Sequence, residues 1–380
     1  MHVLILGTRG IPSKHSGFET FAQDLALFLR DRGHRVTVYC QAGAKEALRE
    51  DTWSDIRRVF IPAGEGSLGS IIFDWKAIRH SLKEEGIVLT LGYNTACFNI
   101  LYRLGGKPNI MNMDGIEWKR QKWSLPSRVW FWVNEWMGAR IATHLVADHP
   151  QIKQHLTRHT AASKISVIPY GADLVSAADV SLIERYELSP KGYYLVIARP
   201  EPENSILEIV NGYSLRSRGV PLVILGRYSH EGTDFQKLVL KNAGPEVKFL
   251  GPIFDRDIVK ALRFYARAYF HGHQVGGTNP SLVESLAASN AVIAHDNRFT
   301  RWVAGDGARY FSSAQQIDDI LTSFESDLTQ LQTMQNASRQ RYMESFTQEN
   351  ILSSYENLLA QFASELPVEG YAKAPTDVSA

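Results

Sequence analysis

The stretch that decides the fold is HGHQVGGTNPSLVESLAASNAVIA, which runs from His271 to Ala294. It contains a polar loop, residues 276–279, that leads directly into Pro280. Proline suits the first turn of a helix because its φ is already helical and no needed N–H is lost. We therefore expect a helix from Pro280 to Ala288, followed by a buried strand over Ala291–Ala294.

This loop and helix form a candidate anion site. Backbone N–H groups and the positive end of the helix dipole both favour phosphate at the start of a helix. Glu284 lies about one turn into the helix, where it can accept hydrogen bonds from sugar hydroxyls. The alternative is a capping box, in which Ser281 and Glu284 only close the end of the helix.

The same stretch resembles the nucleotide-sugar loop of the retaining GT-B glycosyltransferases of family GT4. It is most similar to the bacterial rhamnosyltransferase-like branch, which carries G-G-T-N-P-S-L-x-E, and the resemblance extends from Met1 to about Tyr355. The common motif has a glutamate where this chain has Gly276, so loop amides are expected to replace part of that contact. The resemblance implies a donor site made of Gly276, Gly277, Thr278, Asn279, Pro280, Ser281 and Glu284.

Length and composition indicate a globular protein of about two domains. The chain has 380 residues, 44% of them hydrophobic and 21% charged, and a net charge of +1. This balance argues against a dedicated nucleic-acid binder. Cys40 and Cys97 provide neither a disulfide framework nor the spacing of metal ligands.

We expect a cytoplasmic location. The apolar run over Met1–Leu6 is too short for a signal peptide. No segment approaches the roughly 20 apolar residues that are required to cross a bilayer.

Two consecutive β-α-β patterns predict an α/β protein with two Rossmann-like, doubly wound parallel sheets. We expect a first domain over 1–175 and a second over 190–345, facing each other across a cleft as in the GT-B fold. Ligand loops then meet at the carboxyl ends of the strands. Strands are expected at Val3–Leu6, Arg35–Tyr39, Ile87–Leu91, Asn109–Met113, His144–Ala147, Ile165–Pro169, Tyr193–Ala198, Pro221–Leu225, Lys248–Leu250, Ala268–Phe270 and Ala291–Ala294.

The loop after the first strand disfavours a nicotinamide dehydrogenase, because residues 7–12, GTRGIP, lack the G-x-G-x-x-G fingerprint of such enzymes.

The C-terminal part of the chain is expected to contain one more helix and a tail. The resemblance implies that an amphipathic helix at 347–364 crosses back to the first domain. Residues 366–380 show no periodicity and are expected to be disordered.

Arg199 is the first candidate for catalysis and donor binding. It ends the first strand of the second domain, where a guanidinium can clamp a diphosphate and stabilise the leaving group. The resembling family adds a lysine about five residues later, and here that position is Asn204. Arg9 or Arg227 is a candidate substitute, and a plain surface salt bridge is the alternative for Arg199 itself.

Asp114 is the second catalytic candidate. It follows a strand of the first domain, where a carboxylate can orient an acceptor hydroxyl or stabilise a cationic sugar. Glu117 is an alternative, and so is an Asp-Gly turn without a catalytic role. The resemblance places Gly17 near the donor phosphate, with Ser16 replacing a family glycine, and Ile253 over the nucleobase.

Aromatic and basic residues are interleaved between Trp118 and Trp136. Such a mixture suits contact with an anionic membrane interface, stacking on sugars, or core packing. Base stacking on nucleic acid is less favoured because the chain as a whole is not basic. The residues of this segment are Trp118, Lys119, Arg120, Lys122, Trp123, Arg128, Trp130, Trp132 and Trp136.

Together these features predict a retaining glycosyltransferase with a nucleoside-diphosphate sugar donor and neither a metal nor another cofactor. The branch resemblance implies dTDP-rhamnose as donor and a lipid-linked or polysaccharide acceptor at the inner face of the cell membrane. Two alternatives stay open: a non-catalytic nucleotide- or glycan-binding scaffold, and a nucleotide-sugar epimerase of the same architecture.

Overall fold

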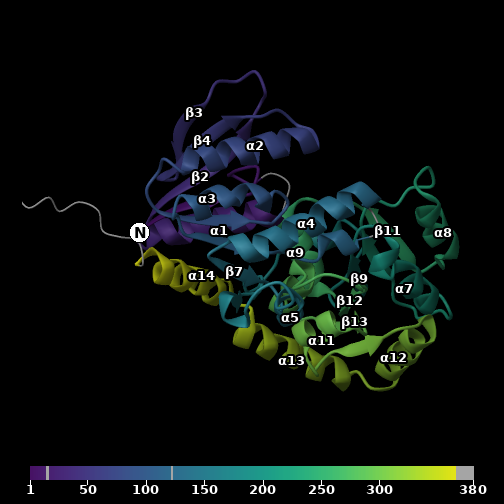
Figure 1. The fold of residues 1–380 in the computed structure, drawn as a ribbon. Helices are drawn as coiled ribbons and strands as arrows, with labels where there is room; N and C mark the ends of the chain where they lie inside the picture. Colours follow the sequence, from purple (N-terminus) through teal and green to yellow (C-terminus); the bar gives the residue numbers. More distant parts are fainter. Residues whose placement is uncertain (14–16, 121–122, 365–380) are drawn as a thin grey trace, which may run out of the picture.

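The computed structural model describes residues 1–13, 17–120 and 123–364. In this part of the chain, strands and helices alternate in two consecutive halves, each built around its own sheet (Figure 1). The expected α/β class with two parallel sheets is confirmed.

The first half contains an eight-stranded sheet in the order β3-β4-β2-β1-β5-β6-β7-β8. Neighbouring strands are parallel except β3 and β4 at one edge, which are antiparallel. Every residue of β5, β6 and β7 is buried, as expected where helices cover both faces of a sheet. The strands are β1 (His2–Leu6), β2 (Arg35–Ala42), β3 (Arg49–Trp53), β4 (Ile56–Pro62), β5 (Ile87–Leu91), β6 (Asn109–Asn112), β7 (His144–Ala147) and β8 (Ile165–Val167).

Helices cover both faces of this sheet. Alternate residues of β1 point to opposite faces: Val3 and Ile5 share a core cluster with α1, whereas Leu4 and Leu6 share another with α2. The helices of this half are α1 (Gly17–Asp31), α2 (Gly66–Ser81), η1 (Ala96–Asn99), α3 (Ile100–Leu104), η2 (Glu117–Lys119), α4 (Leu125–Ile141), α5 (Pro150–Leu156) and η3 (Ala162–Lys164).

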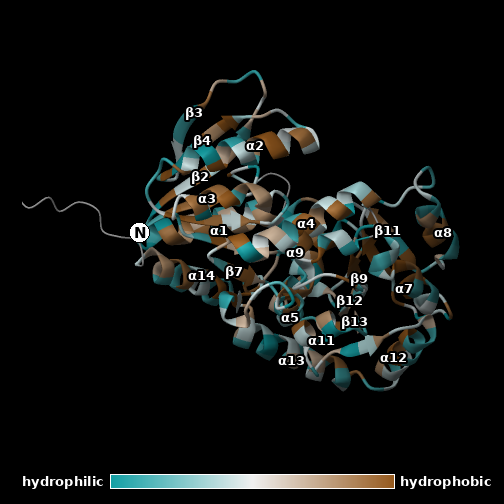
Figure 2. Ribbon diagram, viewed as in Figure 1, coloured by the Kyte–Doolittle hydropathy of each residue, from teal (hydrophilic) through white to brown (hydrophobic). Residues whose placement is uncertain are grey.

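The second half contains a six-stranded, all-parallel sheet in the order β11-β10-β9-β12-β13-β14. Its outer helices carry both hydrophilic and hydrophobic residues, which lets them cover the sheet and face solvent (Figure 2). The strands are β9 (Tyr194–Ile197), β10 (Leu222–Leu225), β11 (Val247–Gly251), β12 (Ala268–His271), β13 (Ala291–His295) and β14 (Arg309–Phe311). The helices are α6 (Ser181–Glu184), η4 (Pro202–Asn204), α7 (Ile206–Tyr213), α8 (Asp234–Asn242), α9 (Arg256–Tyr265), α10 (Pro280–Ala287), α11 (Arg298–Ala304), α12 (Ala314–Ser326) and α13 (Thr329–Ser345).

The last helix, α14 (Gln348–Ala363), lies beside the first half, close to the N terminus (Figure 1). Ile351, Tyr355 and Leu359 join the core cluster that contains α1. The junction before α14 is fixed by Ala172, whose N–H donates to the carbonyl of Phe346. The expected tail at 366–380 lies outside the described residues.

The structure contains a hairpin of β3 and β4 that the sequence analysis does not predict. Ser54 and Asp55 make its turn with φ of 49° and 59°, a conformation that usually carries glycine. β3 is largely charged and its side chains are exposed or half-buried, so it lacks the apolar pattern of a core strand. Neither the turn nor the strand therefore gave a recognisable sequence signal.

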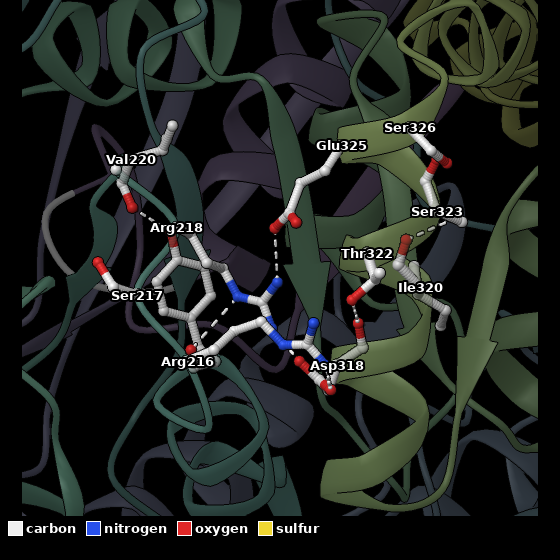
Figure 3. Close-up of polar contacts among 12 residues, drawn as sticks. Arg216, Ser217, Arg218, Val220, Asp318, Ile320, Thr322, Ser323, Glu325 and Ser326 are labelled. Carbon is white, nitrogen blue, oxygen red and sulfur yellow. Dashed lines mark hydrogen bonds and ion pairs between the residues drawn. The ribbon is translucent and has the colours of Figure 1, made fainter.

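One buried ion pair fixes α12 to the loop after α7. The Arg218 side chain is 2% exposed and pairs with Asp318 at 2.5 Å and with Glu325 at 2.8 Å (Figure 3). Arg216 pairs with the other oxygen of Asp318, but its side chain is 50% exposed. The two arginines thus share one carboxylate in very different solvent environments.

We expect Arg218→Met to lower the free energy of unfolding by about 3 kcal/mol, because it leaves the buried Asp318 carboxylate without its buried partner. Arg216→Met is the matched control and should have a much smaller effect, since exposed pairs contribute little. Thermal unfolding of the purified variants checks this. Equal losses in the two variants would contradict the assignment of Arg218 as the main contact.

Candidate functional site

A cavity of about 280 Å³ lies between the two halves. Its walls include residues one or two positions beyond the ends of four strands: Asp114 after β6, Asp148 after β7, Arg199 after β9 and His273 after β12. The carboxyl ends of parallel strands are where open α/β sheets bind their ligands. We call this the central cavity.

The loop Gly276–Asn279 also lines the central cavity and rests on the first half. The Thr278 N–H donates to Asp148 Oδ2 at 2.8 Å, and the Thr278 hydroxyl donates to the Asp148 carbonyl. A Cβ at Gly277 would lie 2.1 Å from the Asp148 carboxylate, so a side chain there is excluded. Gly276 has φ of +130°, which also favours glycine.

The helix that follows the loop begins at Pro280, and Asn279 is its N-cap. The Asn279 side chain accepts from the Ser281 N–H at 3.0 Å. Ser281 therefore lies inside the helix, and its hydroxyl bonds Tyr269 and Arg263 instead. The capping-box alternative is wrong because the N-cap position is already taken by asparagine.

Glu284 lies in a second cavity of about 420 Å³, which we call the lateral cavity. Its carboxylate is half-buried and pairs with the buried Arg263 at 2.5 Å. Gly17, Tyr170 and Pro280 line both cavities, so the two adjoin along this edge. Glu284 can therefore contact a ligand that extends from the central into the lateral cavity.

Two aspartates of the first half, Asp114 and Asp148, line the central cavity. Burial, together with the negative charge of Asp114, raises the pKa of Asp148 well above its ordinary value. Asp114 has φ of +47°, and its N–H donates to Asn112 Oδ1 at 2.8 Å. This strained turn directs the backbone after β6 towards the cavity.

Two stacked histidines come from the second half, and one of them, His273, lines the central cavity. The rings of His271 and His273 are 4.5 Å apart and nearly parallel. Burial, with the positive charges of Arg199 and Arg120, lowers the pKa of His273 to about 4, so its neutral form prevails near pH 7. Sequence reasoning missed this pair, although both residues stand in the quoted stretch.

Several buried polar atoms around the central cavity lack a hydrogen-bond partner within the described ranges: Asp148 Oδ1, His273 Nδ1 and both ring nitrogens of His271. An unpaired buried polar group costs about 1–3 kcal/mol. Native proteins keep such groups where a ligand or water satisfies them. These atoms thus indicate a polar ligand with several hydroxyl or similar groups.

Arg199 is exposed at the rim of the central cavity. Asn204, at the place of the family lysine, is buried and donates through its amide to the Arg199 carbonyl at 2.9 Å. It therefore holds the turn after β9 and adds no charge. Arg120 provides a second cation from the first half, paired with Glu117 at 3.0 Å.

The remaining residues that the sequence analysis proposed for the donor site lie at several places around the cavities. Gly17 begins α1, and a Cβ there would meet no protein atom within 4 Å. Ile253 packs against the second-half core, while its exposed neighbour Phe254 lines the lateral cavity. Arg9 lines a third cavity, described below. Ser16 lies outside the described residues.

The third cavity, of about 860 Å³, belongs to the first half, and we call it the aromatic cavity. Trp123, Trp130 and Phe131 line it, together with the carboxyl groups of Glu19 and Asp74. Burial raises the pKa of Asp74 to about 6. Phe18 lines both this cavity and the central one, so the two are neighbours.

The tryptophan segment thus divides among several environments. Trp123 and Trp130 face the aromatic cavity, whereas Trp132 and Trp136 are exposed on α4. Lys122 lies outside the described residues. Among the described helices, none is long and apolar enough to cross a bilayer.

Metal-binding patterns do not coincide with the central cavity. Asp255-Arg256-Asp257 is an Asp-x-Asp pattern, but Asp255 is the N-cap of α9 and accepts from two backbone N–H groups. Among the described residues, Glu135, His155 and His159 form a group that could hold a metal ion, and none of the three lines a cavity described above.

Comparisons with known proteins fit this architecture. Residues 1–173 match a family model described as a domain of unknown function, DUF1972. No curated protein matches the chain.

Three solved structures show the likeness over nearly the whole chain. Sucrose-phosphate synthase from Thermosynechococcus elongatus is 15% identical, with a TM-score of 0.81 over 96% of this chain and 100% of that one. Anabaena HepE in complex with UDP-glucose is 16% identical, with a TM-score of 0.74 over 96% and 100%. The α,α-trehalose-phosphate synthase (UDP-forming) from Burkholderia vietnamiensis is 10% identical, with a TM-score of 0.71 over 96% and 100%. The chain therefore has the GT-B fold.

We expect Glu284→Gln to weaken binding of a nucleoside diphosphate by about 1–3 kcal/mol, since it removes a charged acceptor from the lateral cavity. The fold should persist, because Arg263 keeps its bond to Ser281. Calorimetric titration with UDP and dTDP, with thermal unfolding alongside, measures both effects. Glu231→Gln, on the exposed surface of the same half, is the control. Unchanged affinity in Glu284→Gln would remove this residue from the site.

Proposed function

We propose that this protein is a glycosyltransferase that transfers a sugar from a nucleoside-diphosphate donor with retention of configuration. The sequence resemblance and the GT-B fold support the proposal, as does the UDP-glucose complex of Anabaena HepE. One observation carries it. The loop–helix unit at Pro280, Arg199 and the unpaired atoms of Asp148 and His273 converge on the central cavity.

In this proposal the donor spans two cavities. The sugar and diphosphate occupy the central cavity, against the loop Gly276–Asn279 and the first turn of α10. The ribose passes Gly17 and Pro280 to reach Glu284 in the lateral cavity. The nucleobase then lies near Phe254, beside the predicted contact at Ile253.

Bond cleavage leaves negative charge on the diphosphate and positive charge on the sugar. Arg199 and the N-terminus of α10 stabilise the negative charge on the diphosphate, because these positive groups are already positioned before the reaction begins. Arg120 adds a cation that the sequence pattern lacks at Asn204. We propose that these groups make a divalent metal unnecessary at the diphosphate, and that Asp114 orients the acceptor hydroxyl or stabilises the cationic sugar.

The aromatic cavity is the proposed acceptor site. Aromatic rings next to carboxyl groups suit a saccharide, whose apolar faces stack while its hydroxyls donate hydrogen bonds. Phe18 separates this cavity from the central one, so an acceptor here lies beside the donor. The G-G-T-N-P-S-L-x-E stretch favours dTDP-rhamnose as donor and a lipid-linked or polysaccharide acceptor.

Arg199→Ala should reduce sugar transfer by at least about tenfold with an unchanged melting temperature, because its charge opposes charge that grows in the transition state. Arg199→Lys should recover only part of the rate, since lysine lacks the bidentate fork. The assay follows labelled sugar from a panel of UDP- and dTDP-sugars, including dTDP-rhamnose, with and without acceptor and chelator.

Arg185→Ala, an exposed arginine of the same half that lines none of the three cavities, is the matched control. A scaffold binds nucleotides but turns over no donor, and an epimerase converts donor without an acceptor. Either result would replace the proposal. Full activity of Arg199→Ala would move the leaving-group role to Arg120 or Arg9.

An exposed apolar stripe on α4 supports peripheral membrane contact. Its residues follow helical spacing on one face and are between 42% and 73% exposed: Leu125, Val129, Trp132 and Trp136. Arg128 and Arg140 are exposed on the same helix. Tryptophan and arginine together suit the interface of an anionic bilayer. We propose that this stripe holds the protein at the inner face of the cell membrane.

Sedimentation with anionic vesicles should therefore occur at low salt and weaken at high salt, because the attraction decays within a Debye length of roughly 10 Å. The double variant Trp132→Ser and Trp136→Ser should lose most of this binding while keeping turnover of a water-soluble acceptor. Trp75→Ser, at a tryptophan on α2 that is 38% exposed, is the control. No sedimentation at low salt, or none lost in the double variant, would end the membrane proposal.

A further inference from the structure

Three side chains of the first half, outside the lining of the central cavity, form a compact group. Glu135 lies on α4, His155 in the last turn of α5, and His159 in the turn that follows. Both histidines direct Nε2 at Glu135 Oε1, at 2.7 Å for His155 and 3.5 Å for His159. All three potential ligand atoms lie within 4.8 Å of one another.

This group has the composition of a zinc site. Two imidazoles and one carboxylate are a common protein ligand set for Zn²⁺, and a water molecule completes the tetrahedron. With metal–ligand bonds of about 2.0–2.2 Å, tetrahedral ligands lie roughly 3.4 Å apart. The observed distances bracket that value, so only small side-chain shifts are required. His159 is the most exposed member, which gives a metal access from solvent.

The surroundings of Glu135 also favour its role as a metal ligand. Its side chain is 2% exposed, and its second oxygen accepts from Trp118 Nε1 at 3.0 Å. Such an outer hydrogen bond fixes the orientation of a metal-ligating carboxylate. The Trp118 ring also contacts the ring of His155, with centroids 6.1 Å apart.

We propose that Glu135, His155 and His159 bind one Zn²⁺ ion, with a water molecule as the fourth ligand, at a site separate from the donor site. The ion joins α4 to the end of α5 and, through Trp118, to η2. This short helix follows the Asp114–Gly115 turn that lines the central cavity. The metal thus stabilises one wall of the cavity while the diphosphate is neutralised by arginines.

The test uses the full chain, stripped with a chelator and then supplied with zinc. We expect about one zinc per chain by elemental mass spectrometry and a higher melting temperature with zinc than without. Cobalt in place of zinc should give the visible absorption of a four-coordinate site. Trp118→Phe should weaken zinc binding about 10- to 100-fold, as losses of outer hydrogen bonds do.

His159→Ala is the deciding variant, because its contact with Glu135 is the longer one and matters less to a metal-free fold. It should fold, bind zinc at least tenfold more weakly and lose the zinc-dependent rise in melting temperature. His230→Ala, an exposed histidine elsewhere, should behave as wild type. If stripped protein takes up no zinc, or His159→Ala keeps full affinity, the three residues form a hydrogen-bonded cluster only and the proposal is wrong.

Discussion

The contact between Asp148 and Thr278 determines how the two halves meet. Asp148 ends a strand of the first half, and Thr278 belongs to the loop that begins α10 in the second. The carboxylate lies so close to Gly277 that any side chain there would overlap with it. The loop therefore rests directly on the first half, and the central and lateral cavities, which residues of both halves line, depend on this packing.

The ionisable side chains of the central cavity differ in how deeply they are buried. Burial favours the protonated form of Asp148 and the neutral form of His273, so it reduces the charge on both of these side chains. Arg199 is exposed and Arg120 is half-buried, so both guanidinium groups lie closer to solvent than these two side chains. A ligand with an anionic part and a polyhydroxyl part matches this division: the rim offers cations, and the floor offers unpaired polar atoms.

Local sequence signals anticipated most of the regular structure. Runs such as Ile87–Leu91 and His144–Ala147 are strands as expected, because fully buried parallel strands are continuously apolar. Pro280 begins a helix as expected, because its fixed φ is already helical and the first turn needs no N–H from this residue. The hairpin of β3 and β4 was missed, since its turn uses Ser54 and Asp55 in place of glycine.

The sequence by itself determined which residues could serve a donor site, but not which of them meet. It identified Arg199, Asp114 and Glu284 from their places at strand and helix ends. Only the tertiary structure paired Glu284 with Arg263 and brought Asp148 against a loop 130 residues further along the chain. The reason is physical. Propensity and periodicity act over a few residues, whereas partners across a cleft are chosen by the packing of two sheets, which no short stretch of sequence encodes.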